Sequence, residues 1–285
     1  MNKMRIVTLT DNTAFHPDLE VEHGLSVHIE TENHKVLFDT GKSNIFIRNA
    51  EKLNIDLREV DIAVISHGHY DHIGGLISFL EINTKAKVYL KKEIFDYQYI
   101  STKGSTQRDI GWSEELLSYK NRFVFLEKEF ETVNELFFIK EIEIGYPLPK
   151  GNARLYKSKS NELKLDDFKH EMIFGIDTPS RLCVFGGCAH NGITNIIQTV
   201  KNHLPEKNIK LIFGGLHLVD ENPFVETETA KELTDIARQI KKLASNALIY
   251  TGHCTGENAK KIIKKVLGEN LQAFSTGLEI EISND

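Results

Sequence analysis

Short apolar runs separated by polar turns recur along the chain and predict alternating strands and helices. In the N-terminal third, Asp61–Ile65 is apolar without alternation, which is typical of a strand buried on both faces. Asn33 and His34 separate two β-branched runs and so predict a hairpin. The predicted strands are Arg5–Leu9, Leu25–Glu30, Lys35–Asp39, Asp61–Ile65 and Lys87–Leu90. One helix is predicted to begin at the cap residue Ser43, and another to span Leu76–Leu80.

The C-terminal part of the chain has the same alternation with longer helices. Thr227–Ala244 places its apolar residues on one stripe, as expected for a helix packed against a core. The other predicted elements are strands Arg181–Phe185, Lys210–Phe213, Ala247–Tyr250 and Leu278–Ile282, and helices Ile193–His203 and Thr255–Leu267. Strands and helices mixed in this way predict an α/β (α+β) fold in which helices cover sheets. Both halves run from strands into helices, which fits a duplicated sandwich.

The middle of the chain has a different pattern. From about 91 to 165 it holds the single Trp, Trp112, together with several Tyr and many Lys and Glu. We interpret the chain as one domain, 1–285, with an insertion at about 91–165 that covers the site, because long irregular connections often carry substrate contacts. The alternative is a solvated connection with a β-hairpin.

Composition excludes several classes of protein. The 285 residues include 35 Lys and Arg and 41 Asp and Glu, a formal net charge of −6, and 40% are hydrophobic. These values exclude a disordered chain and argue against a protein that grips nucleic acid by charge. Three cysteines favour reduced thiols. No apolar run approaches the roughly 20 residues that a spanning helix requires, and no leader is visible, so we expect a cytoplasmic protein that does not enter membranes.

Twelve histidines are present, and the densest group directly follows the buried strand Asp61–Ile65. There, His67, His69, Asp71 and His72 lie within six residues. A turn at the carboxyl end of a strand is where ligands gather in layered α/β folds. Three imidazoles and a carboxylate suit Zn²⁺, with Mn²⁺ and Fe²⁺ as alternatives. We predict a metal site in which His67 and His69 reach one ion while Asp71 and His72 turn toward a second.

The motif His-x-His-x-Asp-His after a buried strand, preceded by Asp39-Thr40-Gly41, resembles the metallo-β-lactamase superfamily. The resemblance implies an αββα sandwich with a one- or two-metal site at its edge. Within that superfamily the chain resembles the branch that includes the 7,8-dihydropterin-6-methyl-4-(ribofuranosyl)aminobenzene-phosphate synthases. The segments that carry this likeness are 66–76, 187–193, 214–218 and 253–256.

The remaining ligands are less determined. The resemblance makes His253 the last metal ligand, since it follows a strand and precedes a helix. Two assignments compete for the other positions: His170 with Cys188, or His190. We favour His190, because 187–193 matches the branch motif as a whole. His170 would then face substrate, and without a bridging group at Cys188 a single ion becomes plausible.

Other residues receive roles from their position. We expect Asp71, His217 and His170 to be catalytic, and His217 to bind a substrate anion or orient a ligand. Asp39 resembles the superfamily's carboxylate that holds a ligand histidine in one tautomer. Glu171 and Asn191 are predicted to contact substrate. We place His16, His34 and His203 in solvent, His23 at the rim of the site, and Cys183 and Cys254 among buried apolar side chains.

These residues predict an enzyme. One or two Zn²⁺ ions would lower the pKa of bound water and polarise a small-molecule substrate. We therefore expect hydrolysis of an ester, a lactone or an anionic, phosphate-bearing compound. The branch resemblance offers an alternative, a bond-forming synthase with an anion site at Lys103 or Arg108. A non-catalytic metal sensor is the third reading. No serine-nucleophile elbow or phosphate-binding loop competes with these hypotheses, and the sequence leaves the oligomeric state open.

Overall fold

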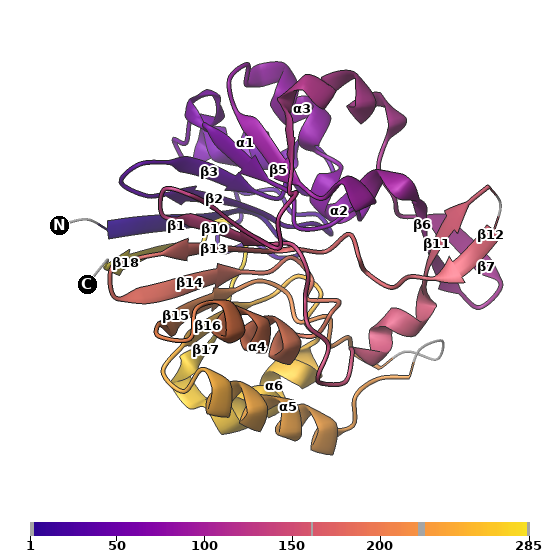
Figure 1. The fold of residues 1–285 in the computed structure, drawn as a ribbon, viewed down its shortest axis with the longest axis vertical. Coiled ribbons are helices and arrows are strands. Elements are labelled where there is room, and N and C mark those ends of the chain that lie inside the picture. The colour runs from indigo at the N-terminus through magenta and orange to yellow at the C-terminus, as the bar shows by residue number, and fades with distance from the viewer. Residues whose placement is uncertain (1–2, 161, 222–225, 284–285) are drawn as a thin grey trace.

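Two seven-stranded sheets pack face to face, with helices on the outer surface of each (Figure 1). The structure is a computed structural model that describes residues 3–160, 162–221 and 226–283. Phe38, Phe174, Phe185 and Phe213 are fully buried in the core between the sheets. The predicted αββα sandwich is therefore confirmed.

The first sheet has the order β18-β1-β2-β3-β4-β5-β8. From β3 to β8 neighbouring strands are parallel, so their carboxyl ends lie at one edge. In chain order the strands are β1 (Lys3–Thr10), β2 (Ser26–Glu30), β3 (Lys35–Phe38), β4 (Ile62–Val64), β5 (Lys87–Leu90), β8 (Phe123–Phe125) and β18 (Glu279–Ser283).

The second sheet has the order β17-β16-β15-β14-β13-β10-β9. Strands β14 to β17 are parallel and also direct their carboxyl ends to one edge. The strands are β9 (Phe130–Val133), β10 (Leu136–Ile139), β13 (Ile173–Asp177), β14 (Arg181–Phe185), β15 (Asn208–Phe213), β16 (Leu248–Thr251) and β17 (Leu271–Ala273). The apolar runs of β9, β13 and β17 were not recognised as strands from the sequence.

Helices bury the outer face of each sheet. Phe46 of α1 and Phe79 of α3 lie in the core over the first sheet. Ile197 of α4, Ile240 of α5 and Ile263 of α6 lie in the core over the second. The α-helices are α1 (Ile45–Lys52), α2 (Tyr70–Ile73), α3 (Leu76–Ile82), α4 (Ile193–His203), α5 (Ala230–Leu243) and α6 (Glu257–Leu267). The 3₁₀ helices are η1 (Leu57–Glu59), η2 (Lys92–Asp96), η3 (Glu114–Arg122), η4 (Lys150–Arg154) and η5 (Gly268–Asn270).

The start of α6 differs from the prediction for a reason that bears on the site. Gly256, not Thr255, is its N-cap residue. The Thr255 hydroxyl instead accepts a hydrogen bond from the backbone N–H of Leu216, at 2.9 Å. This bond ties the loop after β15 to the loop after β16.

The middle region contributes to both large sheets as well as forming a small one. Strand β8 joins the first sheet, while β9 and β10 join the second. Around them, a four-stranded sheet of order β12-β11-β6-β7 projects at the side of the sandwich (Figure 1). Its strands are β6 (Gln98–Lys103), β7 (Thr106–Asp109), β11 (Leu155–Lys159) and β12 (Glu162–Leu165). We refer to it as the small sheet.

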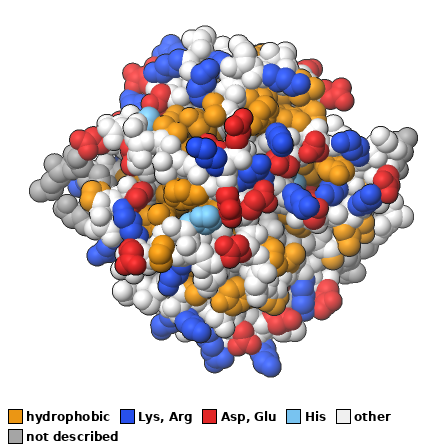
Figure 2. All heavy atoms as spheres, viewed as in Figure 1, with side chains coloured by type: hydrophobic (Ala, Val, Ile, Leu, Met, Phe, Trp, Pro, Cys, Tyr) orange, Lys and Arg blue, Asp and Glu red, His pale blue; other side chains and the backbone are white. Residues whose placement is uncertain are grey.

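The surface has a mixed character. Figure 2 shows acidic and basic side chains interspersed on one face, with apolar side chains between them. Among the described residues, every helix is too short or too polar to cross a bilayer.

Candidate metal centre

The candidate site lies where the carboxyl ends of the parallel strands meet. The turn after β4 carries His67, His69, Asp71 and His72, and the loops after β14, β15 and β16 carry the other candidates. His217 and His253 both adopt left-handed backbone conformations, with φ of 49° and 51°. Such conformations are uncommon for non-glycine residues and occur often at functional sites.

Three imidazoles form one group, which we call the histidine group: His67, His69 and His190. Their candidate ligand atoms all lie within 4.8 Å of one another, and all three residues are buried. The Nε2 atoms of His67 and His190 have no hydrogen-bond partner among the described residues. Burial, reinforced by neighbouring histidines, holds the pKa of His67 and of His190 well below the ordinary value. Both rings are therefore neutral and carry a lone pair, as metal binding requires.

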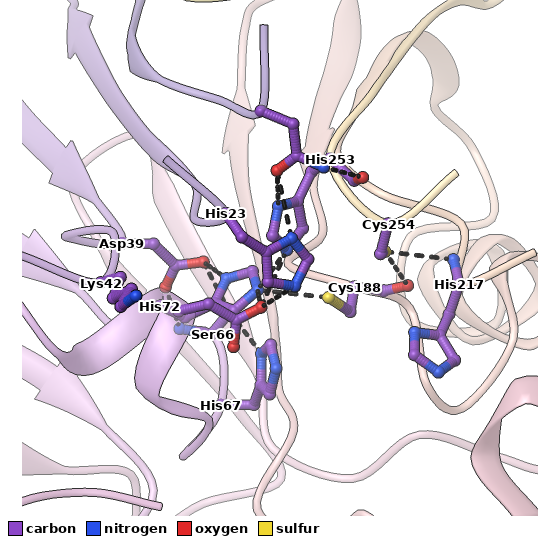
Figure 3. Close-up of polar contacts among 12 residues, drawn as sticks. His23, Asp39, Lys42, Ser66, His67, His72, Cys188, His217, His253 and Cys254 are labelled. Carbon is purple, nitrogen blue, oxygen red and sulfur yellow. Dashed lines mark hydrogen bonds and ion pairs between the residues drawn. The ribbon is translucent and has the colours of Figure 1, made fainter. Parts of the chain in front are cut away.

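Four different donors form the second group, which we call the mixed group: Asp71, His72, Cys188 and His253. His72 Nε2 lies 3.2 Å from Cys188 Sγ and 3.1 Å from His253 Nε2. His253 Nε2 lies 3.2 Å from Asp71 Oδ2. Figure 3 shows His72, Cys188 and His253 pointing toward one another from three separate segments of the chain. Two nitrogens, a thiol and a carboxylate are a donor set suited to a tetrahedral zinc ion.

Asp71 carries the negative charge of the mixed group. Burial opposes ionisation of this carboxyl, but the electrostatic influence of neighbouring His72 and hydrogen bonds from His23 and His253 outweigh it, so the pKa of Asp71 lies well below its usual range. His23 reaches Asp71 Oδ2 at 3.2 Å and stacks on the His253 ring at 4.8 Å. His23 therefore lies at the rim, where the sequence suggested it.

The tautomers of His67 and His72 follow from the partner that holds each Nδ1 atom. His72 Nδ1 donates to Asp39 Oδ2 at 2.7 Å. Asp39 also accepts from the Ser66 hydroxyl, which in turn accepts from His67 Nδ1 at 2.9 Å. In each ring the proton then resides on Nδ1 and the lone pair on Nε2 faces the group. Asp39 thus orients two candidate ligands at once (Figure 3).

Two asparagines contact the Nδ1 atoms of histidines in the other loops. His190 Nδ1 lies 3.0 Å from Asn152 Oδ1, and the Asn152 amide donates to the His190 carbonyl at 2.8 Å. Asn12 repeats this pair of contacts on His253, at 3.3 and 2.7 Å. Sequence reasoning missed both asparagines, because neither lies in a motif and each is distant in the chain from the histidine it holds.

His170 has the opposite arrangement. Its Nδ1 accepts the backbone N–H of Gly68 at 3.0 Å, so its proton resides on Nε2 and is donated to Asp166 Oδ2, also at 3.0 Å. No lone pair is left for an ion. Asp166 Oδ2 also lies 3.6 Å from His69 Nε2, so Asp166 links the two rings. The structure groups His190 with His67 and His69, groups His170 with His69 and Asp166, and places Cys188 in the mixed group.

Glu171 and Asn191 hydrogen-bond to each other and to the loop of His190. The Glu171 carboxylate accepts the backbone N–H groups of His190 and Asn191, each at 2.8 Å. It also accepts from the Asn191 amide at 2.8 Å. Burial raises the pKa of Glu171 despite these hydrogen bonds. Because their polar atoms already have partners, these residues hold the loop, and the contact with substrate that we predicted for them stays untested.

A cavity of about 550 Å³ opens over the two groups. His217 lines it, and both of its ring nitrogens are buried without a partner among the described residues. Its ring lies 4.2 Å from that of His190. Cys254 also lines the cavity, and its Sγ accepts the His217 backbone N–H at 3.3 Å. The prediction that Cys254 is a core side chain is therefore wrong, whereas Cys183 does lie in the core between the sheets.

Close packing of backbone brings the loops together. A Cβ at Gly187 would lie 2.2 Å from Ser66 Oγ and 2.9 Å from His67 Nδ1. Any side chain there would displace the hydrogen bonds that orient His67. Glycine at this position is therefore required by the approach of the β14 loop to the β4 turn.

Outside the site, the histidines differ from expectation in part. His16 is exposed, as predicted. His34 instead hydrogen-bonds to Asp61 at 2.9 Å, and His203 stacks on Phe130, so placing these two in solvent was wrong. Each ring packs against a neighbouring element that the sequence alone does not bring near.

The donor set fits metal ions. Buried Nε2 atoms without partners, oriented by Nδ1 contacts, are costly in a protein unless something binds them. The histidine group has three donors and the mixed group four. A three-donor site leaves a coordination position open, as catalytic zinc sites do, whereas four protein donors complete a tetrahedron.

Comparisons with known proteins identify the family of the chain. Residues 19–149 match the model of the metallo-β-lactamase superfamily. The crystal structure of Tm1679, a metal-dependent hydrolase of the β-lactamase superfamily, is 31% identical and superposes with a TM-score of 0.82, covering 98% of this chain and 99% of that one. The chain belongs to the metallo-β-lactamase superfamily.

Two curated relatives from Methanocaldococcus jannaschii extend over nearly the whole chain. The 7,8-dihydropterin-6-methyl-4-(β-D-ribofuranosyl)-aminobenzene-5′-phosphate synthase is 26% identical, with 97% of this chain and 96% of the relative covered. The uncharacterized protein MJ0448 is 30% identical, with 89% and 91% covered. The predicted likeness to this branch is therefore confirmed. The similar crystal structure is titled a hydrolase, whereas the similar curated protein is named a synthase.

Proposed function

We propose that this protein is a metal-dependent hydrolase of a small ester, lactone or phosphate-bearing molecule. The observation that carries the proposal is the pairing of an open three-imidazole group with a complete four-donor group at the floor of one cavity. His67, His69 and His190 would hold one ion, and Asp71, His72, Cys188 and His253 a second. When bound, such ions lower the pKa of water from about 15.7 to about 7 and polarise a substrate oxygen.

The chain's own residues supply orientation and proton control. Asp39, through Ser66, and Asn152 hold the histidines as Nδ1–H tautomers and so keep Nε2 aimed inward. His217 lines the cavity, and both of its ring nitrogens lack a hydrogen-bond partner among the described residues, so we assign it to hydrogen-bond to substrate. We propose His217 as a catalytic residue and assign Asp166 and His170 to positioning of His69.

The test is activity against a panel of esters, lactones and phosphodiesters before and after chelation. We expect activity to be lost on removal of metal and to return with Zn²⁺ or Mn²⁺. His190→Ala should abolish the return, while His16→Ala, which removes an exposed histidine, should not. Hydrolysis that survives thorough chelation would refute the proposal.

A bond-forming synthase is the second candidate, because the relative named as a synthase matches over 97% of this chain. The two candidates separate by product. Incubation of the metal-loaded protein with a pterin and a phosphorylated aromatic amine should yield a joined product only if the synthase assignment holds. Formation of that product, without hydrolysis anywhere in the panel, would replace the first proposal.

A further inference from the structure

The small sheet presents a row of three side chains to the cavity. In the strand register Ser101 on β6 pairs with Leu155 on β11 on one side and with Arg108 on β7 on the other. Residues paired directly across strands point to the same face of a sheet. Ser101, Arg108 and Leu155 all line the cavity, and Arg154 lines it from the residue before β11.

Arg154 is prepared for a ligand. Its Nε is buried and has no hydrogen-bond partner among the described residues. Leaving a buried donor of a charged group unpaired is costly, so the absence of a protein acceptor points to one supplied from outside. The segment that carries Arg154 is also fixed to the metal centre, because Asn152, two residues earlier, holds His190.

Arg108 lines the same cavity and, among the described residues, is held there by an aromatic ring and not by an acid. Its guanidinium carbon lies 4.6 Å from the centre of the Tyr70 ring, within the range of a cation–π contact. Tyr70 belongs to the metal-binding turn, and its backbone N–H donates to Ile110 at 2.8 Å, which ties the small sheet to that turn. Arg108 therefore faces the same cavity as the metal centre.

Among the described residues, the carboxylates that line the cavity form no salt bridge with Arg108 or Arg154. Across the described part of the chain, no salt bridge joins Arg108 or Arg154 to an acid, whereas Arg5, Arg48 and Arg58 each have one. On the opposite wall, Glu257 pairs with Lys260, and Asp220 accepts the backbone N–H groups at the start of α6. The two guanidinium groups are thus the cationic side of a cavity whose acids already have partners.

We propose that Arg154 and Arg108, with the Ser101 hydroxyl, form a subsite for an oxyanion of the phosphate type carried by the substrate. Guanidinium groups recognise such oxygens through paired, charge-assisted hydrogen bonds. The inference rests on the proposed function, since it places the reacting bond of the same molecule over the metal centre. It narrows the substrate class to small molecules that carry an anionic group apart from the bond that reacts.

The test measures binding and does not need turnover. Zinc-loaded protein is titrated by calorimetry with phenylphosphonate, which resists hydrolysis, and with benzoate and benzyl alcohol as carboxylate and neutral probes. We expect phenylphosphonate to bind more tightly than benzyl alcohol. Arg154→Gln should lower the affinity for phenylphosphonate at least about tenfold. Arg154→Lys should recover part of the affinity, because lysine restores the positive charge but not the paired N–H donors of the guanidinium group.

The control variant is Arg181→Gln, an exposed arginine at the start of β14. It should bind phenylphosphonate like the native protein, and zinc content and thermal unfolding verify that every variant is folded and loaded. Tighter binding of benzoate that depends on the arginines would retain the subsite and identify the anion as a carboxylate. Equal phenylphosphonate affinity in the Arg108→Gln/Arg154→Gln double variant and in Arg181→Gln would overturn the proposal, because the metal centre alone would then bind the anion.

The outcome is separable from that of the proposed function. Arginine-dependent binding without hydrolysis would leave the subsite standing and remove the hydrolase. Metal-dependent hydrolysis together with arginine-independent binding would support the hydrolase and remove the subsite.

Discussion

The histidine group and the mixed group share one cavity floor but differ in chemistry. The first consists of three neutral imidazoles, and the second contains a carboxylate, a thiol and two imidazoles in mutual contact. An ion with three protein donors keeps a position for water or substrate, whereas one with four is closed. Under the proposed function, the ion in the histidine group would activate water, and the ion in the mixed group would chiefly add positive charge beside it.

The largest effect should come from the open group. His67→Ala removes one of its three donors, and we expect hydrolysis to fall about a thousandfold, since a catalytic metal contributes several kcal/mol. Metal analysis should show one ion fewer per chain, and His16→Ala serves as the control. Full activity in His67→Ala would mean that the open site lies elsewhere.

A smaller loss should follow from the closed group. Cys188→Ser replaces a thiolate with a weaker ligand, so the second ion should be lost while the histidine group keeps its own. We expect roughly a tenfold to hundredfold loss of metal affinity at that group. Cys183→Ser, in the core between the sheets, should lower stability without changing metal content. If Cys188→Ser still binds two ions tightly, Cys188 is not a ligand.

Asn152 tests whether a residue that is not itself a proposed ligand contributes to metal affinity by orienting His190. Asn152→Ala removes the acceptor for His190 Nδ1 and frees the ring to change tautomer. We expect about a tenfold loss of metal affinity, measured by competition with a chelator, with the fold intact. Asn121→Ala, at an exposed asparagine, is the matched control. An unchanged affinity would show that the β14 loop holds His190 without Asn152.

His28 is a buried histidine outside the two candidate metal groups and can be compared with them. Its ring nitrogens are buried and without partners in the described structure, yet it lies in β2, between Val7 and Leu37 on the neighbouring strands. Burial, with smaller contributions from Arg5 and Lys35, lowers its pKa to about 4. An unpartnered imidazole without converging donors therefore implies a cost of protonation and not a metal site.

That cost has a measurable sign. Because the pKa of His28 is lower in the folded chain than the ordinary 6.5, the unfolded state binds the proton first, and stability present above pH 6.5 is lost as the pH falls toward 4. Between pH 7.5 and pH 5 the native protein should lose about 2 kcal/mol of unfolding free energy more than His28→Leu, as measured in urea. Parallel losses in the two proteins would contradict this.

Most of the fold could be predicted from the sequence, because apolar periodicity is a local signal. The cap predictions were wrong, since the N-cap residues of α1 and α6 are Asn44 and Gly256 and not Ser43 and Thr255. Strands β3, β4 and β5 and helices α4 and α5 follow directly from such patterns. The small sheet could not be predicted, since β7 and β12 are short and exposed along their length. Their register comes from pairing with β6 and β11.

For the site, the sequence by itself determined which chemistry was available. The strand-end motifs named His67, His69, Asp71, His72 and His253 as candidates, because a buried strand followed by imidazoles is a local pattern. Only the tertiary structure shows which nitrogen of His170 and of His190 is held, and our choice of His190 as the proposed ligand rests on that. It also placed Cys188 against His72, 116 positions apart in the chain, and Arg154 beside the cavity. Hydrogen bonds and cavities are made by residues distant in the chain, so the tautomers and the partners that they establish exist only once the two sheets have packed.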